Sequence, residues 1–142
     1  MKIKQIMAIK VVIDTNVLVA SLSSKSQHHW IIELLLQGKL TAFVTTEMMH
    51  EYEEILERKY SATVANHFLK ALRELPNVIF IQIYFQWNLL ADADDNKFVD
   101  CYIASNAEYI VTNDSDYRIL KTVGFPKVMT LTIEQFKKIL PV

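Results

Sequence analysis

An α/β fold, with a central, mainly parallel β-sheet between two layers of helices, is the fold class that this sequence predicts. Short runs of β-branched and other apolar residues recur along the chain, as in buried parallel strands. Segments with apolar residues at helical spacing separate most of these runs. Glycine and proline are scarce, with 2 and 3 residues among 142, which favours regular elements joined by short turns.

The expected strands are apolar runs bounded by polar or turn-forming residues. Ile9–Ile13 is the clearest, because it is rich in β-branched residues and stops at Asp14. The segment 84–90 has no clear pattern, although Phe85 and Trp87 are expected to pack. The other expected strands are residues 40–44, 78–83, 109–112 and 128–130.

The expected helices carry apolar residues on one face and have recognisable start or stop signals. Gly38 follows the first, over residues 29–37, and Thr45-Thr46 looks like the cap of the second, over 47–58. Ser61 would cap a third helix, which ends before Pro76. The remaining expected helices are residues 94–106, 114–120 and a last helix that begins at Thr132 and runs to Leu140. Strands thus alternate with helices, as in a parallel sheet with right-handed crossovers.

Length and composition indicate one domain over residues 1–142. No run of about 18 uncharged apolar residues exists, so we expect no membrane span. The N-terminus lacks the apolar stretch of a secretory signal. Cys101 is the only cysteine and can form no internal disulfide, so a cytoplasmic location is the natural expectation.

Acidic residues follow the ends of several expected strands. Asp14 stands directly after the first strand, and Glu51 lies on the helix that follows the second. Because the carboxyl ends of parallel strands share one edge of the sheet, where ligands bind in such folds, these acids are expected to converge. The further acids at this edge are Asp94 and Asp95 at the start of a helix, and Asp114 and Asp116 after the strand that ends at Thr112.

Carboxylates brought together repel one another and raise their own pKa values unless a cation lies among them. Oxygen-rich sites of this kind suit Mg²⁺ or Mn²⁺. Such an ion can align a water molecule, lower its pKa and stabilise charge on a phosphoryl oxygen, and two ions about 4 Å apart could hold both the attacking and the leaving oxygen. The acids therefore indicate phosphodiester hydrolysis.

Each acid also has a purely structural explanation. An Asp after a strand is often a helix cap or a turn former. Asp94 and Asp95 could cap the helix at Asn96, and Asp114 could cap the helix near Ser115. Glu51 could be a solvated helix residue. The expected convergence of the acids, and no single one of them, favours a functional site.

Four segments of the chain resemble the PIN-domain family. They are Val12-Ile13-Asp14-Thr15-Asn16-Val17-Leu18, Glu51-Tyr52 with Ile55-Leu56, Asp94-Asp95-Asn96-Lys97-Phe98, and Ile110-Val111-Thr112-Asn113-Asp114-Ser115-Asp116. The resemblance spans residues 10 to about 140. It implies a PIN-like three-layer α/β/α sandwich and, as in many PIN domains, a ribonuclease that uses Mg²⁺ or Mn²⁺. Many small bacterial members resemble VapC-type toxins of toxin–antitoxin pairs, so RNA is the implied substrate and an antitoxin protein the implied partner.

The resemblance also implies roles for individual residues. Asp14, Glu51, Asp95 and Asp114 would be the catalytic acids that hold the metal, with Asp116 as an accessory metal ligand. Asn16 and Thr112 would orient carboxylates or water. Lys97 would contact a phosphate, or be simply an exposed helix residue. Asp94 and Asp100 remain further candidates, although Asp100 stands five residues from Asp95 and so not on the same helix face.

The net charge of −1 argues against nucleic-acid binding, because a strongly basic domain is its usual footprint. Divalent cations in an acidic site can, however, offset phosphate charge. Arg58, Lys59, Lys70 and Arg73 could line a groove for RNA or simply solvate two helices. The helices over 47–58 and 61–75 carry apolar residues beyond one face, which suggests a homodimer interface or an antitoxin groove.

Two other functions stay open. The chain could be a catalytically inactive PIN-fold binding or regulatory module, in which the acids serve the structure. It could also be a phosphatase with Asp14 as nucleophile, but the haloacid-dehalogenase type needs a second Asp where this chain has Asn16. His28 and His29 have no Cys or His partner at ligand spacing, so we expect exposed polar residues and no zinc site.

Overall fold

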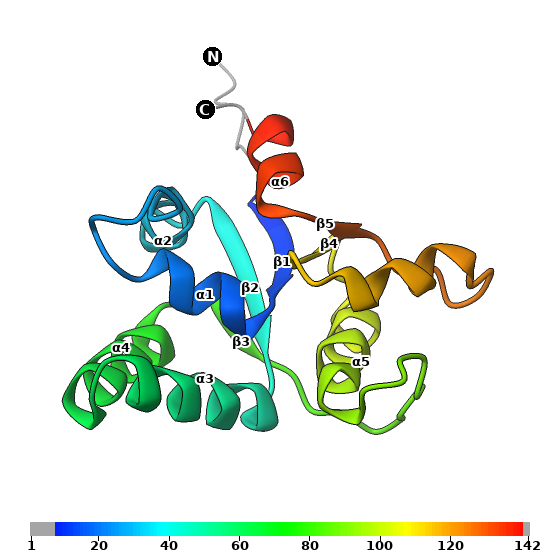
Figure 1. The fold of residues 1–142 in the computed structure, drawn as a ribbon, viewed down its shortest axis with the longest axis horizontal. Helices are drawn as coiled ribbons and strands as arrows, with labels where there is room; N and C mark the ends of the chain where they lie inside the picture. Colours follow the sequence, from blue (N-terminus) through cyan, green and yellow to red (C-terminus); the bar gives the residue numbers. More distant parts are fainter. Residues whose placement is uncertain (1–7, 141–142) are drawn as a thin grey trace, which may run out of the picture.

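A five-stranded, fully parallel sheet organises the described part of the chain, residues 8–140, in the computed structural model (Figure 1). The strand order is β3-β2-β1-β4-β5, and every neighbouring pair is parallel. The strands are β1 (Ile9–Ile13), β2 (Leu40–Val44), β3 (Val78–Phe80), β4 (Tyr109–Val111) and β5 (Thr130–Leu131). The predicted parallel sheet is confirmed.

Helices cover both faces of this sheet. The chain runs outward from β1 to β2 and β3, then returns to add β4 and β5 on the other side of β1. Because parallel crossovers are right-handed, this reversal places the later helices on the opposite face. Figure 1 shows the first four helices on one side and α5 with η2 on the other. The helical elements are α1 (Thr15–Ser21), α2 (Trp30–Leu36), α3 (Thr46–Lys59), α4 (Ala62–Glu74), η1 (Ala93–Asp95), α5 (Asn96–Ser105), η2 (Ser115–Thr122) and α6 (Ile133–Ile139). The predicted three-layer architecture is confirmed.

The core lies between the sheet and these helices. Val11, Val12 and Ile13 of the central strand are at most 2% exposed, as expected for a parallel strand covered on both faces. Thr45 accepts a hydrogen bond from Met48 N and Ser61 from Val64 N, so both predicted caps are present. Among the helices of residues 8–140, none has both the length and the apolar character that crossing a membrane requires.

One helix was not expected from the sequence. α1 begins immediately after β1, with Asp14 as its N-cap residue, and buries Val17, Leu18 and Val19. It has only seven residues, two of its buried residues are β-branched valines, and the cap side chain makes no capping hydrogen bond. These features explain why the local sequence does not predict a helix at this position.

The third strand is shorter than predicted. β3 ends at Phe80, whereas the apolar run suggested a strand to Ile83. Its neighbour β2 ends at Val44 because Thr45 caps α3, and Ile81 N donates the last hydrogen bond, to Val44 O at 2.8 Å. The following residues, 81–87, form an extended segment without a strand partner, which ends before Asn88 with its left-handed φ of 52°. The last strand is likewise displaced, to residues 130–131 from the expected 128–130.

Candidate active site

The strand order reverses between β1 and β4, and Asp14 and Thr112 follow these two strands. Asp14 N donates to Val111 O at 3.1 Å, and Thr112 Oγ1 donates to Asp14 Oδ2 at 2.8 Å. Thr112 Oγ1 also accepts a hydrogen bond from Asp114 N at 3.1 Å. Crevices at such reversal points are the usual ligand sites of open α/β sheets. The buried Thr112 hydroxyl therefore connects two acids at this edge.

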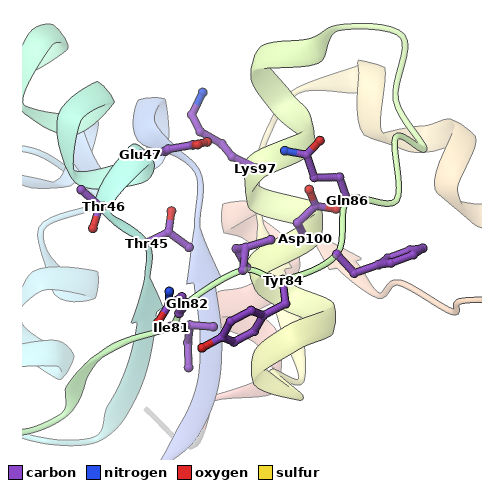
Figure 2. A pocket seen from close by; sticks show the side chains of 11 residues that line it. Thr45, Thr46, Glu47, Ile81, Gln82, Tyr84, Gln86, Lys97 and Asp100 are labelled. Carbon is purple, nitrogen blue, oxygen red and sulfur yellow. The ribbon is translucent and has the colours of Figure 1, made fainter.

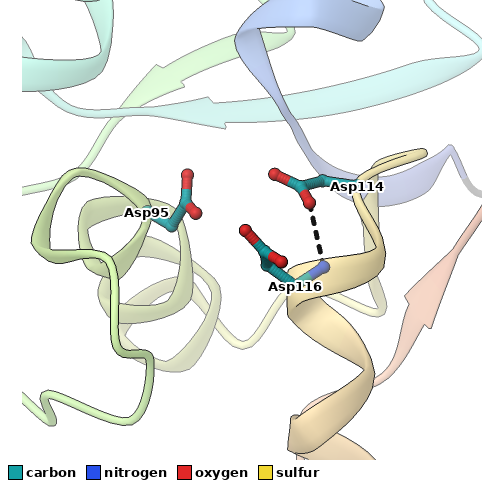
Figure 3. A group of neighbouring side chains, drawn as sticks. All are labelled: Asp95, Asp114 and Asp116. Atoms are coloured by element: carbon teal, nitrogen blue, oxygen red, sulfur yellow. Dashed lines mark hydrogen bonds between the residues drawn. The ribbon is translucent and has the colours of Figure 1, made fainter.

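Three carboxylates meet beside this edge. One oxygen from each of Asp95, Asp114 and Asp116 lies within 4.8 Å of the others. Figure 3 shows that Asp95 comes from the turn before α5, whereas Asp114 and Asp116 come from the start of η2, and that the three side chains point toward a common space. We call these three residues the acid cluster. Residues from two distant parts of the sequence thus form it.

Asp14 lies at the edge of the acid cluster and is only 6% exposed. Burial raises the pKa of the Asp14 carboxyl, and the charges of Glu51 and Asp114 raise it further. The hydrogen bond from Thr112 acts in the opposite direction, because it favours the ionised form. The effect of both charges on Asp14 indicates that Asp14, Glu51 and Asp114 belong to one acidic region.

Glu51 approaches the region from α3 and is held by two partners. The Thr15 hydroxyl donates to Glu51 Oε2, and Lys97 Nζ lies 2.9 Å from Glu51 Oε1. Lys97 Nζ also donates to Asp94 O at 2.6 Å. Lys97 is therefore neither a freely exposed helix residue nor an unpaired cation. It joins α3 to the turn that carries Asp95.

Asp95 shows the strongest effect of this crowding among the half-buried acids. Burial, together with the charges of Asp92, Asp114, Asp14 and Glu51, raises the pKa of Asp95 from 3.8 to about 6. Asp95 precedes α5, yet its side chain makes no capping hydrogen bond. Its carboxylate is therefore directed to the acid cluster.

The structural explanations for the acids hold only in part. Asp114 does cap η2, since its Oδ1 accepts a hydrogen bond from Asp116 N at 2.9 Å (Figure 3). Asp92, and neither Asp94 nor Asp95, caps the turn before α5. Asp14 occupies the N-cap position of α1 without a side-chain cap. Capping therefore explains one oxygen of Asp114 and leaves the other acids unexplained.

The remaining candidates lie around the acid cluster. Asn16 is exposed and lines a cavity of about 290 Å³ together with Asp14 and Asp114. Asp94 is exposed and faces the region only through its backbone oxygen. Asp100 is buried and accepts a hydrogen bond from Trp87 N at 3.0 Å, so it faces the extended segment after β3 and lies outside the acid cluster.

Several residues near the site were not expected from the sequence. His28 is half-buried and lines the same cavity as Asp14, although it was expected to be exposed. Tyr52 donates from its hydroxyl to Ile13 O at 2.6 Å. Tyr117 is buried and its hydroxyl has no partner in the part of the chain that the structure describes. Burial and the charges of Asp14 and Asp95 raise the pKa of Tyr117. Thr15, Tyr52 and Tyr117 each stand next to a candidate acid in the sequence, namely Asp14, Glu51 and Asp116. This adjacency is the one sequence signal that could have pointed to them.

The donor set fits a hard divalent cation. The acid cluster supplies three carboxylate oxygens, and Asp14 and Glu51 supply further negative charge nearby. No imidazole or thiol belongs to the cluster of described side chains, so its ligand chemistry suits Mg²⁺ or Mn²⁺ better than zinc. Burial and the repulsion of neighbouring carboxylates raise the pKa of Asp95, and a bound cation would relieve the repulsion.

Solved structures with a similar fold share most of the chain. A structure titled as VapBC2 from Rickettsia felis, bound to a DNA fragment from its promoter, aligns with a TM-score of 0.62, 15% identity and coverage of 87% of this chain and 98% of that one. Mycobacterium tuberculosis VapC20, described as a Sarcin-Ricin loop cleaving toxin, aligns with a TM-score of 0.58 and 14% identity, and the alignment covers 84% of this chain and 98% of that one. The PIN domain endonuclease Utp24 aligns with a TM-score of 0.52 and 17% identity, and the alignment covers 87% of this chain and 84% of that one. At these identities the similarity establishes the fold.

Sequence comparison identifies the family. An uncharacterized protein of Methanocaldococcus jannaschii is 32% identical over 114 residues, which cover 76% of this chain and 72% of that protein. The family model described as "PIN domain" matches residues 10–116, a range that contains Asp14, Glu51, the acid cluster, all of β4 and all of β1 except its first residue. The chain therefore belongs to the PIN domain family.

Proposed function

We propose that this protein is a metal-dependent endoribonuclease that hydrolyses phosphodiester bonds of RNA with Mg²⁺ or Mn²⁺, and that it acts as the toxin of a toxin–antitoxin pair. The observation that carries the nuclease proposal is the meeting of Asp95, Asp114 and Asp116, with oxygens within 4.8 Å of one another, beside the buried Asp14. Membership of the PIN domain family supports it. Residues 1–142 would form a single PIN-like domain.

In this proposal the acids have distinct tasks. Asp95, Asp114 and Asp116 would hold the cation, and Asp14 and Glu51 would complete its negative surroundings. A bound divalent ion would supply an activated water and stabilise charge on a phosphoryl oxygen. Thr112 would keep Asp14 ionised and oriented through its hydrogen bond. Asn16 lines the cavity next to Asp14 and would contact water or the scissile phosphate.

Metal binding tests the first half of the proposal. Mn²⁺ titration followed by calorimetry is expected to detect a site that is lost in Asp95→Asn and Asp114→Asn, because each removes one charge of the acid cluster. Glu134→Gln is the matched control, since Glu134 is an exposed acid on α6 whose only ion-pair partner among the described residues is Lys138 at 3.7 Å. Equal Mn²⁺ binding by all four proteins would refute the proposed metal site.

RNA cleavage tests the second half. With Mn²⁺ or Mg²⁺ present, the wild-type protein is expected to cleave structured and unstructured RNA, and chelation of the ion or Asp14→Asn is expected to abolish cleavage. Glu134→Gln should cleave like the wild type. Intact RNA with several substrates, combined with Mn²⁺ binding at the acid cluster, would favour the non-catalytic module. Cleavage that survives Asp14→Asn would point to a contaminating nuclease.

The toxin assignment has its own support and test. Two of the structures with a similar fold are VapBC2 and VapC20, and VapC20 is described as a toxin that cleaves the Sarcin-Ricin loop. An antitoxin or a second copy of the chain could cover the exposed apolar side chains at the end of α3 and on α4, where Tyr60, directly after α3, is 40% exposed and Val64 is 37% exposed. Expression of the chain alone is expected to arrest growth, and co-expression of a small DNA-binding protein encoded next to it should relieve the arrest. Light scattering would show whether the isolated chain is a homodimer.

A further inference from the structure

A second cavity adjoins the proposed active site through Lys97, which is paired with Glu51. Its volume is about 500 Å³, which lies within the range of small-molecule sites. It is bounded by the start of α3, by the extended segment after β3 and by α5, and Figure 2 shows Glu47 and Lys97 at one end, Tyr84 at the other and Asp100 between them. We call it the side cavity. Lys97, which lines it, lies 2.9 Å from Glu51 of the proposed active site.

The charges of the side cavity exclude a phosphate as its occupant. Glu47 and Asp100 line it with carboxylates, and its one lining cation, Lys97, is already paired with Glu51. The remaining lining groups are threonines, glutamines and apolar or aromatic side chains. A neutral, planar group that donates hydrogen bonds fits this combination.

Asp100 is the acceptor that such a group would meet. Its side chain is 6% exposed, and Trp87 N donates to Oδ1 at 3.0 Å. No donor to Oδ2 occurs within residues 8–140. Oδ2 is not among the buried, unpartnered atoms of the described side chains, so it keeps an exposed surface, and a ligand in the side cavity can donate to it in place of water. Burial is also the main cause that raises the pKa of Asp100.

Tyr84 supplies a flat apolar surface at the other end. Tyr84 is 87% exposed, which is unusually high for an aromatic residue. Exposed aromatic rings next to a nuclease site stack on unpaired bases, and such stacking tolerates any base. Gln82 and Gln86, which also line the side cavity, can both donate and accept hydrogen bonds.

We propose that the side cavity binds one base of single-stranded RNA and prefers bases with an exocyclic amino group, namely adenine, cytosine and guanine, over uracil. Asp100 accepts a hydrogen bond from the amino group, and Tyr84 stacks on the base. Uracil carries a carbonyl oxygen, O4, where cytosine carries its amino group, and this oxygen would face the carboxylates unfavourably. The backbone of the bound nucleotide then leads past Lys97 to the acid cluster. This inference rests on the proposed ribonuclease function.

The test uses Asp14→Asn protein with Mg²⁺, so that RNA is bound without being cleaved. Fluorescein-labelled pentacytidylate and pentauridylate are titrated and followed by fluorescence anisotropy. Pentacytidylate is expected to bind about tenfold more tightly than pentauridylate, in line with one specific base contact. Tyr84→Ala should weaken both by about tenfold through lost stacking. Tyr60→Ala, another exposed tyrosine outside the side cavity, is the matched control and should change neither.

Asp100→Asn tests the base preference itself. Asn keeps an oxygen for Trp87 N but presents an amide donor to the cavity, so the preference for cytidylate should disappear while uridylate binding is kept or improved. Thermal unfolding shows whether the variant is folded, and Tyr84→Ala, on an exposed side chain, tests the cavity independently. Equal binding of the two RNAs, a preference that survives Asp100→Asn, or equal effects of Tyr84→Ala and Tyr60→Ala would overturn the inference.

The two proposals can fail separately. If RNA cleavage is absent but the cytidylate preference depends on Asp100, the chain binds RNA at the side cavity without being a nuclease. If cleavage depends on Asp14 but neither RNA is preferred, the nuclease proposal stands and the side cavity has no role in base recognition.

Discussion

Lys97 Nζ lies 2.9 Å from Glu51 Oε1, so a cation of the protein itself already neutralises one acid of the proposed active site. Both side chains are largely buried, with exposed fractions of 14% and 26%. This pair also ties α3 to the turn before α5, because Lys97 Nζ donates to Asp94 O. Glu51 is therefore held ready near the acid cluster, but a bound metal ion would have to compete with Lys97 for it.

Replacing Lys97 should separate its contribution to stability from its competition with a metal ion for Glu51. Lys97→Gln is expected to lower the free energy of unfolding of the metal-free protein by about 1–2 kcal/mol, because a partly buried charged hydrogen bond is lost. It should also tighten Mn²⁺ binding, because Glu51 no longer has a competing cation. Denaturant unfolding and Mn²⁺ titration measure the two changes.

The Arg58–Glu54 pair provides the control. It has a similar distance of 2.9 Å, but its side chains are 69% and 66% exposed, so Arg58→Gln should change the stability by less than about 1 kcal/mol and leave Mn²⁺ binding unaltered. Equal losses of stability in the two variants would contradict the importance of burial for the Lys97–Glu51 pair.

The crowded acids predict that the metal-free protein becomes less stable as pH rises. The pKa of Asp95 is about 6 in the folded protein, against an ordinary value of 3.8, so the folded state binds more protons between these values. Stability from this group is therefore greatest below about pH 4 and falls until about pH 6. Asp14, whose pKa is also raised, acts in the same direction.

Thermal unfolding over this pH range, with and without Mg²⁺, provides the measurement. Added Mg²⁺ should stabilise the protein more at neutral than at acidic pH, because ligand carboxylates must be ionised to bind it. Asp95→Asn should flatten the dependence of the metal-free protein. If Asp95→Asn and the wild type have parallel profiles, Asp95 does not titrate in this range.

The sheet and the edge where the acids meet were predictable because they depend on local patterns. Val11, Val12 and Ile13 form a β-branched run of a kind that is stable as a buried strand, and the acids after β1 and β4 need only the parallel rule to be placed. The pairing of Glu51 with Thr15 and Lys97 was not predictable. It depends on which turn of α3 faces α1 and α5, and that is decided by packing between distant segments.

The first residues of the extended segment after β3, 81–83, were wrongly predicted as strand for a related reason. Residues 78–83 form an apolar run that suits a strand, but a strand needs a neighbour, and β2 has already ended before Thr45, which caps α3. The backbone instead finds partners in other elements, such as Asp100 for Trp87 N and Asn96 for Leu90 N. Side-chain acceptors on α5 thus replace the hydrogen bonds that a neighbouring strand would have provided. No local sequence pattern predicts these acceptors.

Thr112 is expected to support both metal binding and folding. Thr112→Val keeps the shape of the side chain but removes the donor to Asp14 Oδ2 and the acceptor for Asp114 N. The free energy of unfolding should fall by about 1–3 kcal/mol, because buried polar groups lose partners. The pKa of Asp14 should rise further, since the Thr112 hydrogen bond lowers it, and Mn²⁺ binding should weaken.

Thr112→Ser retains the hydroxyl and serves as the control for this variant. It should lose only packing of one methyl group and keep the Mn²⁺ affinity of the wild type. Denaturant unfolding and Mn²⁺ titration of both variants are compared. A Thr112→Val protein that binds Mn²⁺ as well as Thr112→Ser would show that the hydroxyl does not orient Asp14.

Two buried tyrosines near the acids should respond in opposite ways to loss of the hydroxyl. Tyr52 and Tyr117 are 2% and 1% exposed, but the Tyr52 hydroxyl donates to Ile13 O at 2.6 Å, whereas that of Tyr117 has no partner among residues 8–140. Tyr52→Phe is expected to cost about 1 kcal/mol of stability, and Tyr117→Phe to add about 1 kcal/mol, because an unsatisfied buried hydroxyl is removed. Denaturant unfolding of the metal-free proteins measures both changes. A loss of stability in Tyr117→Phe would mean that its hydroxyl has a partner in solution, and a repeat with Mn²⁺ present would show whether that partner belongs to the occupied metal site.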